Sequence, residues 1–165
     1  MKKTVRLLML AMVAALAFSA AAAEENPVRV YQPDASAYSF EIPESLTEEA
    51  LPEDAAESGM VAYLADPGTG LCVEIYRLDK AGKSLEAFVE EDAATYGGTN
   101  VVPAGEYLGL TAGWYDITDP EGQYRIQYLF LDDGDCWLVL GYTLNSDEAA
   151  DEIYAILQTL KRSDP

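Results

Sequence analysis

Apolar and polar residues alternate in three consecutive runs between Ala112 and Leu144, and this alternation predicts three antiparallel strands. The motif Asp119-Pro120-Glu121-Gly122 separates the first two runs and has the residues that a type I turn prefers. With these four residues as the loop, Asp116 faces Arg125, which is a favourable cross-strand charge pair. We therefore expect a three-stranded meander at the centre of the fold.

The second turn, Asp132-Asp133-Gly134, allows two registers. A two-residue Asp-Gly loop is the commoner hairpin signal, and it places Gln127 opposite Leu140. A three-residue loop with its glycine in a left-handed bulge places Tyr128 opposite Leu138 instead. Because a slip of one residue exchanges the faces of a strand, we favour the loop that keeps the apolar residues together. The core face predicted in this way consists of Tyr115, Ile117, Tyr124, Ile126, Tyr128, Phe130, Leu138, Leu140, Tyr142 and Leu144.

The opposite face of the predicted meander mixes aromatic and polar residues. It is too apolar for full exposure to water and too polar for a deep core, so we expect something to cover part of it. One hypothesis is an aromatic binding patch made of Trp114, Arg125, Gln127 and Trp137. The structural alternative is that a helix packs over these side chains, because large exposed apolar patches are uncommon.

The regions around the meander predict further elements. Alternating apolar residues indicate a strand over residues 36–42 and a hairpin of residues 60–65 with residues 71–78. Thr47 can cap a short helix through Ala50. Ser84 caps a helix over residues 85–96, in which apolar residues recur at helical spacing.

A closing helix follows the meander. Asn145 or Ser146 is its cap, and Ala149, Ile153, Ile156, Leu157 and Leu160 form one apolar stripe. Lys161 and Arg162 come at its end, where the helix dipole favours positive charge.

The first 23 residues have the features of a secretory signal peptide. Lys2, Lys3 and Arg6 precede an apolar run from Leu7 to Phe18, and a run of alanines offers a cleavage site. Residues 24–35 contain two prolines around a short β-like run from Val28 to Tyr31 and predict an N-terminal tether that can include an edge strand, and residues 36–163 predict a single α/β domain. We expect a secreted or extracytoplasmic monomer with no membrane segment after removal of the signal peptide.

The charge of the predicted mature chain limits the classes of molecule that it can bind. Removal of residues 1–23 leaves seven basic and 29 acidic residues, a net charge of −22. Such a surface repels phosphate backbones and anionic lipids, which argues against binding of nucleic acid or membranes. Solubility is one explanation for the charge, and a cationic or calcium-bearing partner is another. Asp132, Asp133 and Asp135 could offer oxygen ligands to calcium, although the rest of an EF-hand loop is missing.

Cys72 and Cys136 are the two cysteines of the chain. An exported protein can keep a disulfide, and a bridge between them would close a long loop. The strand parity of the two residues argues against the bridge, and burial as small apolar side chains is the alternative. The sequence leaves this choice open.

The sequence offers little catalytic chemistry. It contains no histidine, which excludes histidine-dependent nucleophiles, acid–base catalysis and metal ligation. It also has no phosphate-binding glycine loop or Gly-x-Ser-x-Gly motif. We therefore expect no catalytic residues and no cofactor apart from the calcium hypothesis. A hydrolase that uses carboxylates alone is the alternative, and it would need one sheltered carboxyl group.

The order of elements resembles a known superfamily. The opening strand Tyr-Ser-Phe-Glu-Ile-Pro-Glu-Ser starts at Tyr38, a helix starts Ser-Leu-Glu-Ala-Phe at Ser84, and the chain closes with Ile-Tyr-Ala-Ile-Leu-Gln-Thr-Leu-Lys from Ile153. Together with the hairpin and the meander, these segments resemble the Mog1/PsbP-like superfamily. The resemblance implies an α+β fold in which helices pack on both faces of an antiparallel sheet, an α/β/α sandwich. It implies little about activity, because members serve as photosystem accessory subunits, a nuclear-transport cofactor and exported bacterial proteins. Together with the missing catalytic chemistry, it favours a binding or accessory module that acts on another extracytoplasmic protein or a small ligand.

Overall fold

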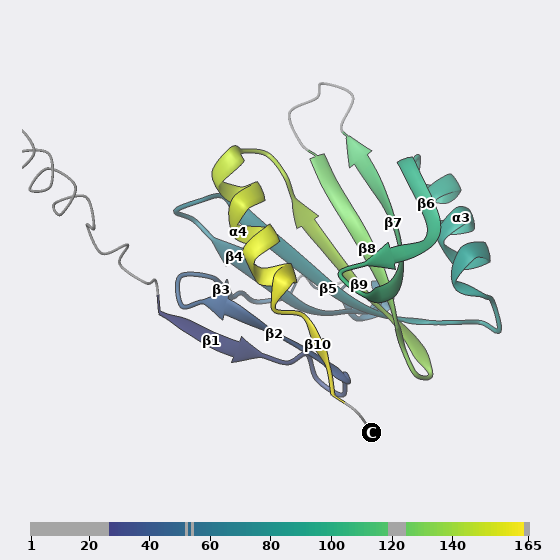
Figure 1. Cartoon of the computed structure of the whole chain (residues 1–165), viewed down its shortest axis with the longest axis horizontal. Helices are drawn as coiled ribbons and strands as arrows, with labels where there is room; N and C mark the ends of the chain where they lie inside the picture. The colour runs from purple at the N-terminus through teal and green to yellow at the C-terminus, as the bar shows by residue number, and fades with distance from the viewer. Residues whose placement is uncertain (1–26, 52, 54, 119–124, 164–165) are drawn as a thin grey trace, which may run out of the picture.

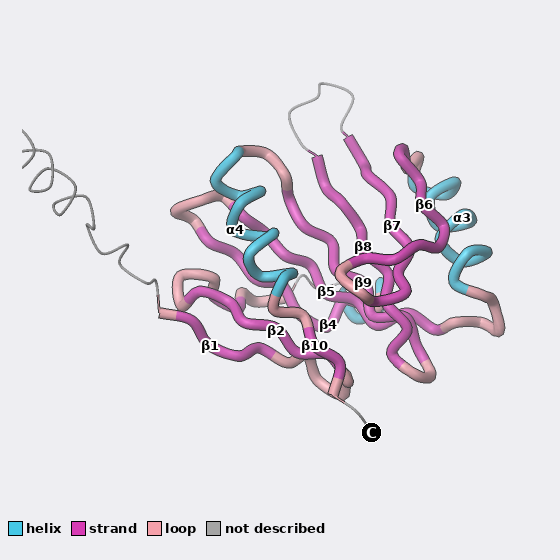
Figure 2. Tube along the Cα trace, in the orientation of Figure 1, coloured by secondary structure: helices cyan, strands magenta, loops and turns pink. Residues whose placement is uncertain are grey.

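The computed structural model describes residues 27–51, 53, 55–118 and 125–163. The chain adopts a mixed α+β fold with antiparallel sheets, as expected (Figures 1 and 2). The predicted signal peptide and the turn at residues 119–122 lie outside the described residues. No helix in the described part of the chain is long and apolar enough to span a membrane.

The elements follow one another in a strand-rich order. They are β1 (Val28–Tyr31), β2 (Tyr38–Pro43), β3 (Thr47–Glu48), α2 (Ala55–Ser58), β4 (Met60–Asp66), β5 (Leu71–Asp79), α3 (Leu85–Tyr96), β6 (Thr99–Tyr107), β7 (Leu110–Thr118), β8 (Arg125–Asp133), β9 (Cys136–Thr143), α4 (Asp147–Gln158) and β10 (Lys161–Arg162).

Seven strands form the main sheet in the order β3-β4-β5-β9-β8-β7-β6, and three form a smaller sheet in the order β1-β2-β10. The smaller sheet and α3 lie at opposite ends of the molecule (Figure 1). The segment predicted as a tether supplies β1, and its Tyr31 is buried in the core. The folded unit therefore begins at Val28, earlier than the predicted start at Ser36.

Both long helices form where the sequence predicts them. The hydroxyl oxygen of Ser84 accepts from the backbone N–H of Ala87, and α3 ends at Gly97 in the left-handed conformation. The hydroxyl oxygen of Ser146 accepts from the N–H of Ala149 at the start of α4.

Two local predictions, one at Thr47 and one at Lys161 and Arg162, are wrong. Lys161 and Arg162 pair with β2 as strand β10 and do not extend α4. Thr47 and Glu48 pair with β4 as the edge strand β3, so Thr47 does not cap a helix. In both cases a neighbouring strand supplies backbone hydrogen bonds that the local sequence pattern does not reveal.

The predicted register between the last two strands of the meander is also wrong. Asp133 pairs with Cys136, so Gly134 and Asp135 form a two-residue loop, and Tyr128 lies opposite Gly141. The first hairpin is shifted by two residues, with Asp116 opposite Gln127, which leaves its faces unchanged. The assumption of a single apolar face caused the error in the second hairpin, because every residue from Cys136 to Tyr142 is buried.

The correct register divides the apolar residues into two clusters. Alternation along β8 assigns Phe130 to one face and its neighbours Leu129 and Leu131 to the other. Helix α3 contributes Val89 and Ala93 to the cluster with Phe130, Tyr115, Trp137 and Val139. Helix α4 packs its stripe against the larger cluster that contains Leu129, Leu131, Leu138, Leu140 and Tyr142. The predicted core face is therefore divided: its β9 residues lie in the cluster with α4, and Tyr115 and Phe130 lie in the cluster with α3.

Candidate functional site

A cavity of about 560 Å³ opens between α3 and the sheet face that this helix contacts. This volume falls in the range of small-molecule sites. We call it the tyrosine pocket, because four tyrosines contribute to its wall. Its lining residues are Glu57, Ser58, Tyr76, Leu78, Asp79, Phe88, Asp92, Tyr96, Tyr115, Ile117, Tyr128 and Val139.

Strand pairing sets the floor of the tyrosine pocket. Glu74 of β5 lies opposite Gly141 of β9, Gly141 lies opposite Tyr128 of β8, and Tyr128 lies opposite Tyr115 of β7. Gly141 has no side chain, and a Cβ atom placed there would lie 2.6 Å from Cε1 of Tyr128. The glycine therefore lets the tyrosine ring lean across β9 towards Glu74.

Two carboxylates hold three of the lining tyrosines by their hydroxyl groups. Tyr76 and Tyr128 donate to the same oxygen of Glu74, Oε2, at 2.8 and 3.2 Å. Tyr115 donates to Oδ2 of Asp92 at 2.7 Å. These bonds hold each ring at its hydroxyl end and leave the ring surface to line the cavity.

The tyrosine rings meet at an angle to one another. The ring centroids of Tyr115 and Tyr128 are 5.5 Å apart with planes inclined by 33°, and those of Tyr76 and Tyr128 are 6.5 Å apart with planes inclined by 53°. Tyr96 is 63% exposed and stands at the rim. The rings therefore form a concave aromatic wall.

Burial is the main influence on ionisation in the tyrosine pocket. It raises the pKa of Tyr76, Tyr115 and Tyr128, and hydrogen bonds or charge from Glu74 and Asp92 raise them further. Burial also raises the pKa of Asp92, which the hydrogen bond from Tyr115 partly offsets. The tyrosines therefore stay neutral, and their hydroxyl groups donate to the carboxylates.

The described lining of the tyrosine pocket contains three carboxylates and no basic side chain. The basic residues nearest to the lining in the sequence, Arg77, Lys80 and Lys83, have other partners. The guanidinium group of Arg77 donates to Sγ of Cys136 at 3.1 and 3.2 Å. Nζ of Lys80 lies 2.9 Å from Asp132 and 4.4 Å from the ring centroid of Trp137, and Nζ of Lys83 lies 2.6 Å from Glu91. The pocket therefore suits a positively charged ligand.

Three residues of the predicted aromatic patch share one sheet face, on the side of α4. Oδ1 of Asp116, a buried residue, accepts from Gln127 at 2.7 Å, and its Oδ2 accepts from Arg125 at 3.2 Å and from Asn100 at 2.9 Å. Trp114 lies two residues before Asp116 on β7 and packs against the larger core cluster. This is a satisfied hydrogen-bond network around one carboxylate.

Trp137, the fourth residue of the predicted patch, lies on the other face of the sheet. It is 3% exposed and packs against Phe88 of α3. The predicted register differs from the observed one by three residues, an odd number, and therefore places Trp137 on the same face as Trp114. The four residues therefore do not form a common surface.

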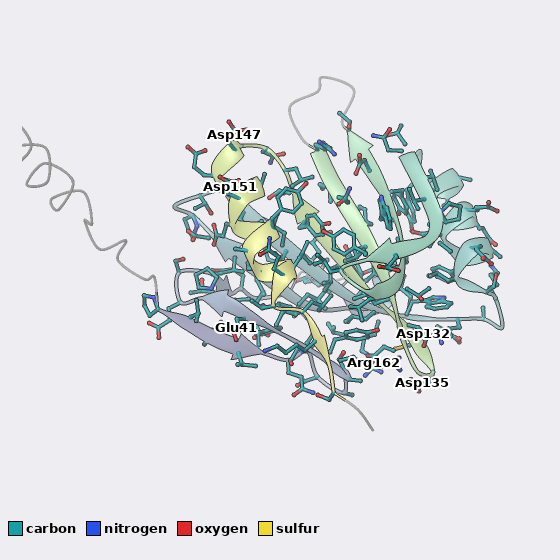
Figure 3. All side chains as sticks on the ribbon, viewed as in Figure 1. Glu41, Asp132, Asp135, Asp147, Asp151 and Arg162 are labelled. Atoms are coloured by element: carbon teal, nitrogen blue, oxygen red, sulfur yellow. The ribbon has the colours of Figure 1, made fainter. Side chains whose placement is uncertain are left out.

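The carboxylates proposed for calcium do not converge on one point, because Asp133 and Asp135 approach Arg77 whereas Asp132 approaches Lys80. Asp132 pairs with Lys80, and Asp133 is buried and accepts from the backbone N–H of Ala37 at 2.9 Å. Asp135 is exposed, with its carboxylate 3.7 Å from Arg77 (Figure 3 shows Asp132 and Asp135 at the β8–β9 turn). Among the described residues, no group of three or more potential ligands could hold a metal ion.

Cys72 and Cys136 are both free. Cys136 pairs with Asp79 at one end of β5, whereas Cys72 lies seven residues away at the other end. That separation is roughly 23 Å along a strand, and a disulfide needs Cα atoms within about 7 Å. The structure therefore excludes the bridge, and Cys136 instead accepts from the guanidinium group of Arg77 at 3.1 and 3.2 Å.

Sequence reasoning missed the tyrosine pocket, although it placed Tyr115 and Tyr128 on a common face. The missed signal is the excess of tyrosine, with 11 in the chain against four phenylalanines. A buried tyrosine usually needs a partner for its hydroxyl group. Tyrosines at sheet positions that face a helix therefore indicate a polar site beneath that helix.

Comparisons with known proteins show the fold. A scan of protein-family models found no match, and a search of curated proteins also found none. Cyanobacterial PsbP (CyanoP) from Synechocystis sp. PCC 6803 is similar in structure, with a TM-score of 0.57 and 10% identity over 87% of this chain and 97% of that one. The Ran-binding protein Mog1p from Saccharomyces cerevisiae is similar with a TM-score of 0.51 and 9% identity over 85% of this chain and 97% of that one.

A protein from Bacteroides thetaiotaomicron VPI-5482 gives a TM-score of 0.52 at 13% identity, over 82% of this chain and 48% of that one. The fold is thus Mog1/PsbP-like, as the order of elements indicated. At sequence identities of 9–13%, the structural similarity supports a conclusion about the fold alone.

Proposed function

We propose that this chain uses its Mog1/PsbP-like fold as an extracytoplasmic binding module for small organic cations, with the tyrosine pocket as the ligand site. The single observation that carries the proposal is the wall of the pocket. It combines four tyrosines and Phe88 with three carboxylates, and its described part has no basic side chain. Aromatic faces attract cations through their quadrupoles, and carboxylates add a direct charge attraction.

The net charge and the predicted signal peptide of the chain support the same proposal. The net charge of −22 expected for the mature protein raises the local concentration of cations around it. The predicted signal peptide would deliver the domain outside the cytoplasm as a monomer. The two apolar clusters support an α/β/α sandwich, in which α3 and the sheet enclose the pocket between layers.

Calorimetric titration of the purified protein tests the proposal. The probes are choline, ethanolamine and the neutral isostere of choline, 3,3-dimethyl-1-butanol. At least one cation should bind about tenfold more tightly than the neutral alcohol, because charge is the only large difference between choline and its isostere. Equal binding of all three compounds, or binding of none at millimolar concentration, would overturn the proposal.

A variant pair locates the site. Asp92→Asn removes a carboxylate that lines the pocket, and it should weaken cation binding by about threefold to tenfold. Glu90→Gln removes the same charge from an exposed position of α3 that does not line the pocket. This control should change the affinity by less than about twofold.

A carboxylate-dependent hydrolase is the second candidate, and one observation favours it. Asp92 lies in a cavity, and burial raises its pKa, which is what a general acid requires. Asp79 and Glu57 are the other carboxylates of the lining, and both are exposed. Incubation with ester and glycoside substrates would test it: turnover that Asp92→Asn abolishes supports the hydrolase.

A further inference from the structure

We infer that the tyrosine pocket selects quaternary ammonium groups, such as the trimethylammonium group of choline, over ammonium groups that carry N–H bonds. This inference rests on the proposed function and names its ligand class. It depends on which interactions with the ligand come from the carboxylates and which come from the aromatic rings.

The tyrosines already occupy oxygens of two carboxylates, Glu74 and Asp92, and Asp92 also lines the pocket. Oε2 of Glu74 accepts two hydroxyl protons, from Tyr76 and Tyr128, and Oδ2 of Asp92 accepts one from Tyr115. Glu74 does not line the pocket, so its charge acts from behind the rings. A ligand in the pocket therefore senses this negative charge mainly through an aromatic surface.

The other lining carboxylates, Glu57 and Asp79, are exposed to water, so the aromatic part of the wall offers few acceptors for ligand N–H bonds. A primary ammonium group must exchange three hydrogen bonds to water for acceptors in the site, and an unsatisfied buried donor is costly. A quaternary ammonium group has no N–H bonds, so it makes no such demand. Contact of its methyl groups with ring faces also buries apolar surface.

The shape of the wall suits a rounded cation. The rings of Tyr76, Tyr115 and Tyr128 incline to one another by 33° and 53°, so they present surfaces in different directions. Tyr96 adds an exposed ring at the rim and Phe88 a further ring from α3. Several aromatic surfaces around one cavity form a cage, which is the recurring protein solution for quaternary ammonium binding.

The test compares the affinities of choline and ethanolamine for the purified protein. We expect choline to bind at least about tenfold more tightly. Equal or tighter binding of ethanolamine would overturn the inference, and if both cations still bind better than 3,3-dimethyl-1-butanol, the proposed function survives. Failure of both cations to exceed the neutral alcohol would overturn both.

Variants at Tyr128 separate the ring from its hydroxyl group. Tyr128→Phe keeps the aromatic surface and removes only the hydroxyl group, so choline affinity should change by less than about threefold. Tyr128→Leu removes the ring and should weaken choline binding by about tenfold. An equal loss in both variants would overturn the inference. The same pair at Tyr76 gives an independent test if either Tyr128 variant does not fold, as judged by its thermal melt.

Discussion

Gly141→Ala is the most direct perturbation of the tyrosine pocket, because it adds one methyl group beneath the ring of Tyr128. The new Cβ would lie 2.6 Å from Cε1 and 3.0 Å from Cδ1 of Tyr128, and 3.3 Å from Oε2 of Glu74. Ordinary contact begins at 3.4 Å, so the ring has to retreat by about 0.8 Å. It has little room to do so, because it packs between Tyr115 and Tyr76.

The cost follows from two effects. Overpacking a half-buried ring costs about 1–3 kcal/mol. The hydrogen bond from Tyr128 to Glu74, already 3.2 Å long, would lengthen further and lose part of its contribution of about 1 kcal/mol. We expect the free energy of unfolding to fall by about 2 kcal/mol, which lowers the melting temperature by about 4–8 °C in a domain of this size.

Urea unfolding measures the change in stability, and titration with choline at a temperature where the variant is folded measures binding. Gly113→Ala is the matched control, because its Cβ would lie 2.6 Å from the carbonyl oxygen of Pro103 and 2.7 Å from Val89, away from Tyr128. Both variants should lose stability, and only Gly141→Ala should lose choline affinity. A Gly141→Ala protein with stability within about 0.5 kcal/mol of the original would refute the crowding argument.

Three further predictions concern other parts of the molecule. Asp116→Ala leaves three donor side chains without their buried acceptor. It should lower the free energy of unfolding, measured in urea, by about 3 kcal/mol. A loss below about 1 kcal/mol would show that the hydrogen bonds to Asp116 contribute little to stability. Both carboxylate oxygens of Glu152 are buried without a hydrogen-bond partner, and burial raises its pKa. The folded state therefore holds this proton more tightly than the unfolded state, so the stability that the protonated group provides is lost as the pH rises through its folded pKa. Glu152→Gln should thus stabilise the protein at pH 7 by about 0.5 kcal/mol after allowance for solvent screening, more than the exposed control Asp151→Asn, and the gain should vanish at acidic pH in thermal melts. Cys72 and Cys136 should both react with a thiol reagent in denaturant, and a reductant should leave the melting temperature unchanged; a drop of several degrees would indicate a bridge.

The helices could be predicted because their signals are local. Ser84 and Ser146 are caps within three residues of the groups that they bind, and the stripe of α4 repeats at helical spacing. Strands β7, β8 and β9 were equally clear as strands. Their existence depends on short apolar runs, which the sequence shows directly.

The register and the site required information that is not local. A strand buried on both faces, such as β9, shows no alternation of apolar and polar residues. Its sequence therefore does not determine its register or the length of its loop. The tyrosine pocket depends on that register, because Gly141 lies between Glu74 and Tyr128 only when Asp133 pairs with Cys136. The predicted register, which differs by three residues, places Leu138 opposite Tyr128 and so gives no indication of the site.

The position of β2 between β1 and β10 has a consequence for how the protein is made. Tyr38 and Ser39 near the start of the chain pair with Arg162 and Lys161 near its end, so the smaller sheet closes only after almost the entire polypeptide has emerged. Contacts between such distant segments slow folding. For a chain exported as proposed here, β10 can join β2 only after residues 161–162 have crossed the membrane.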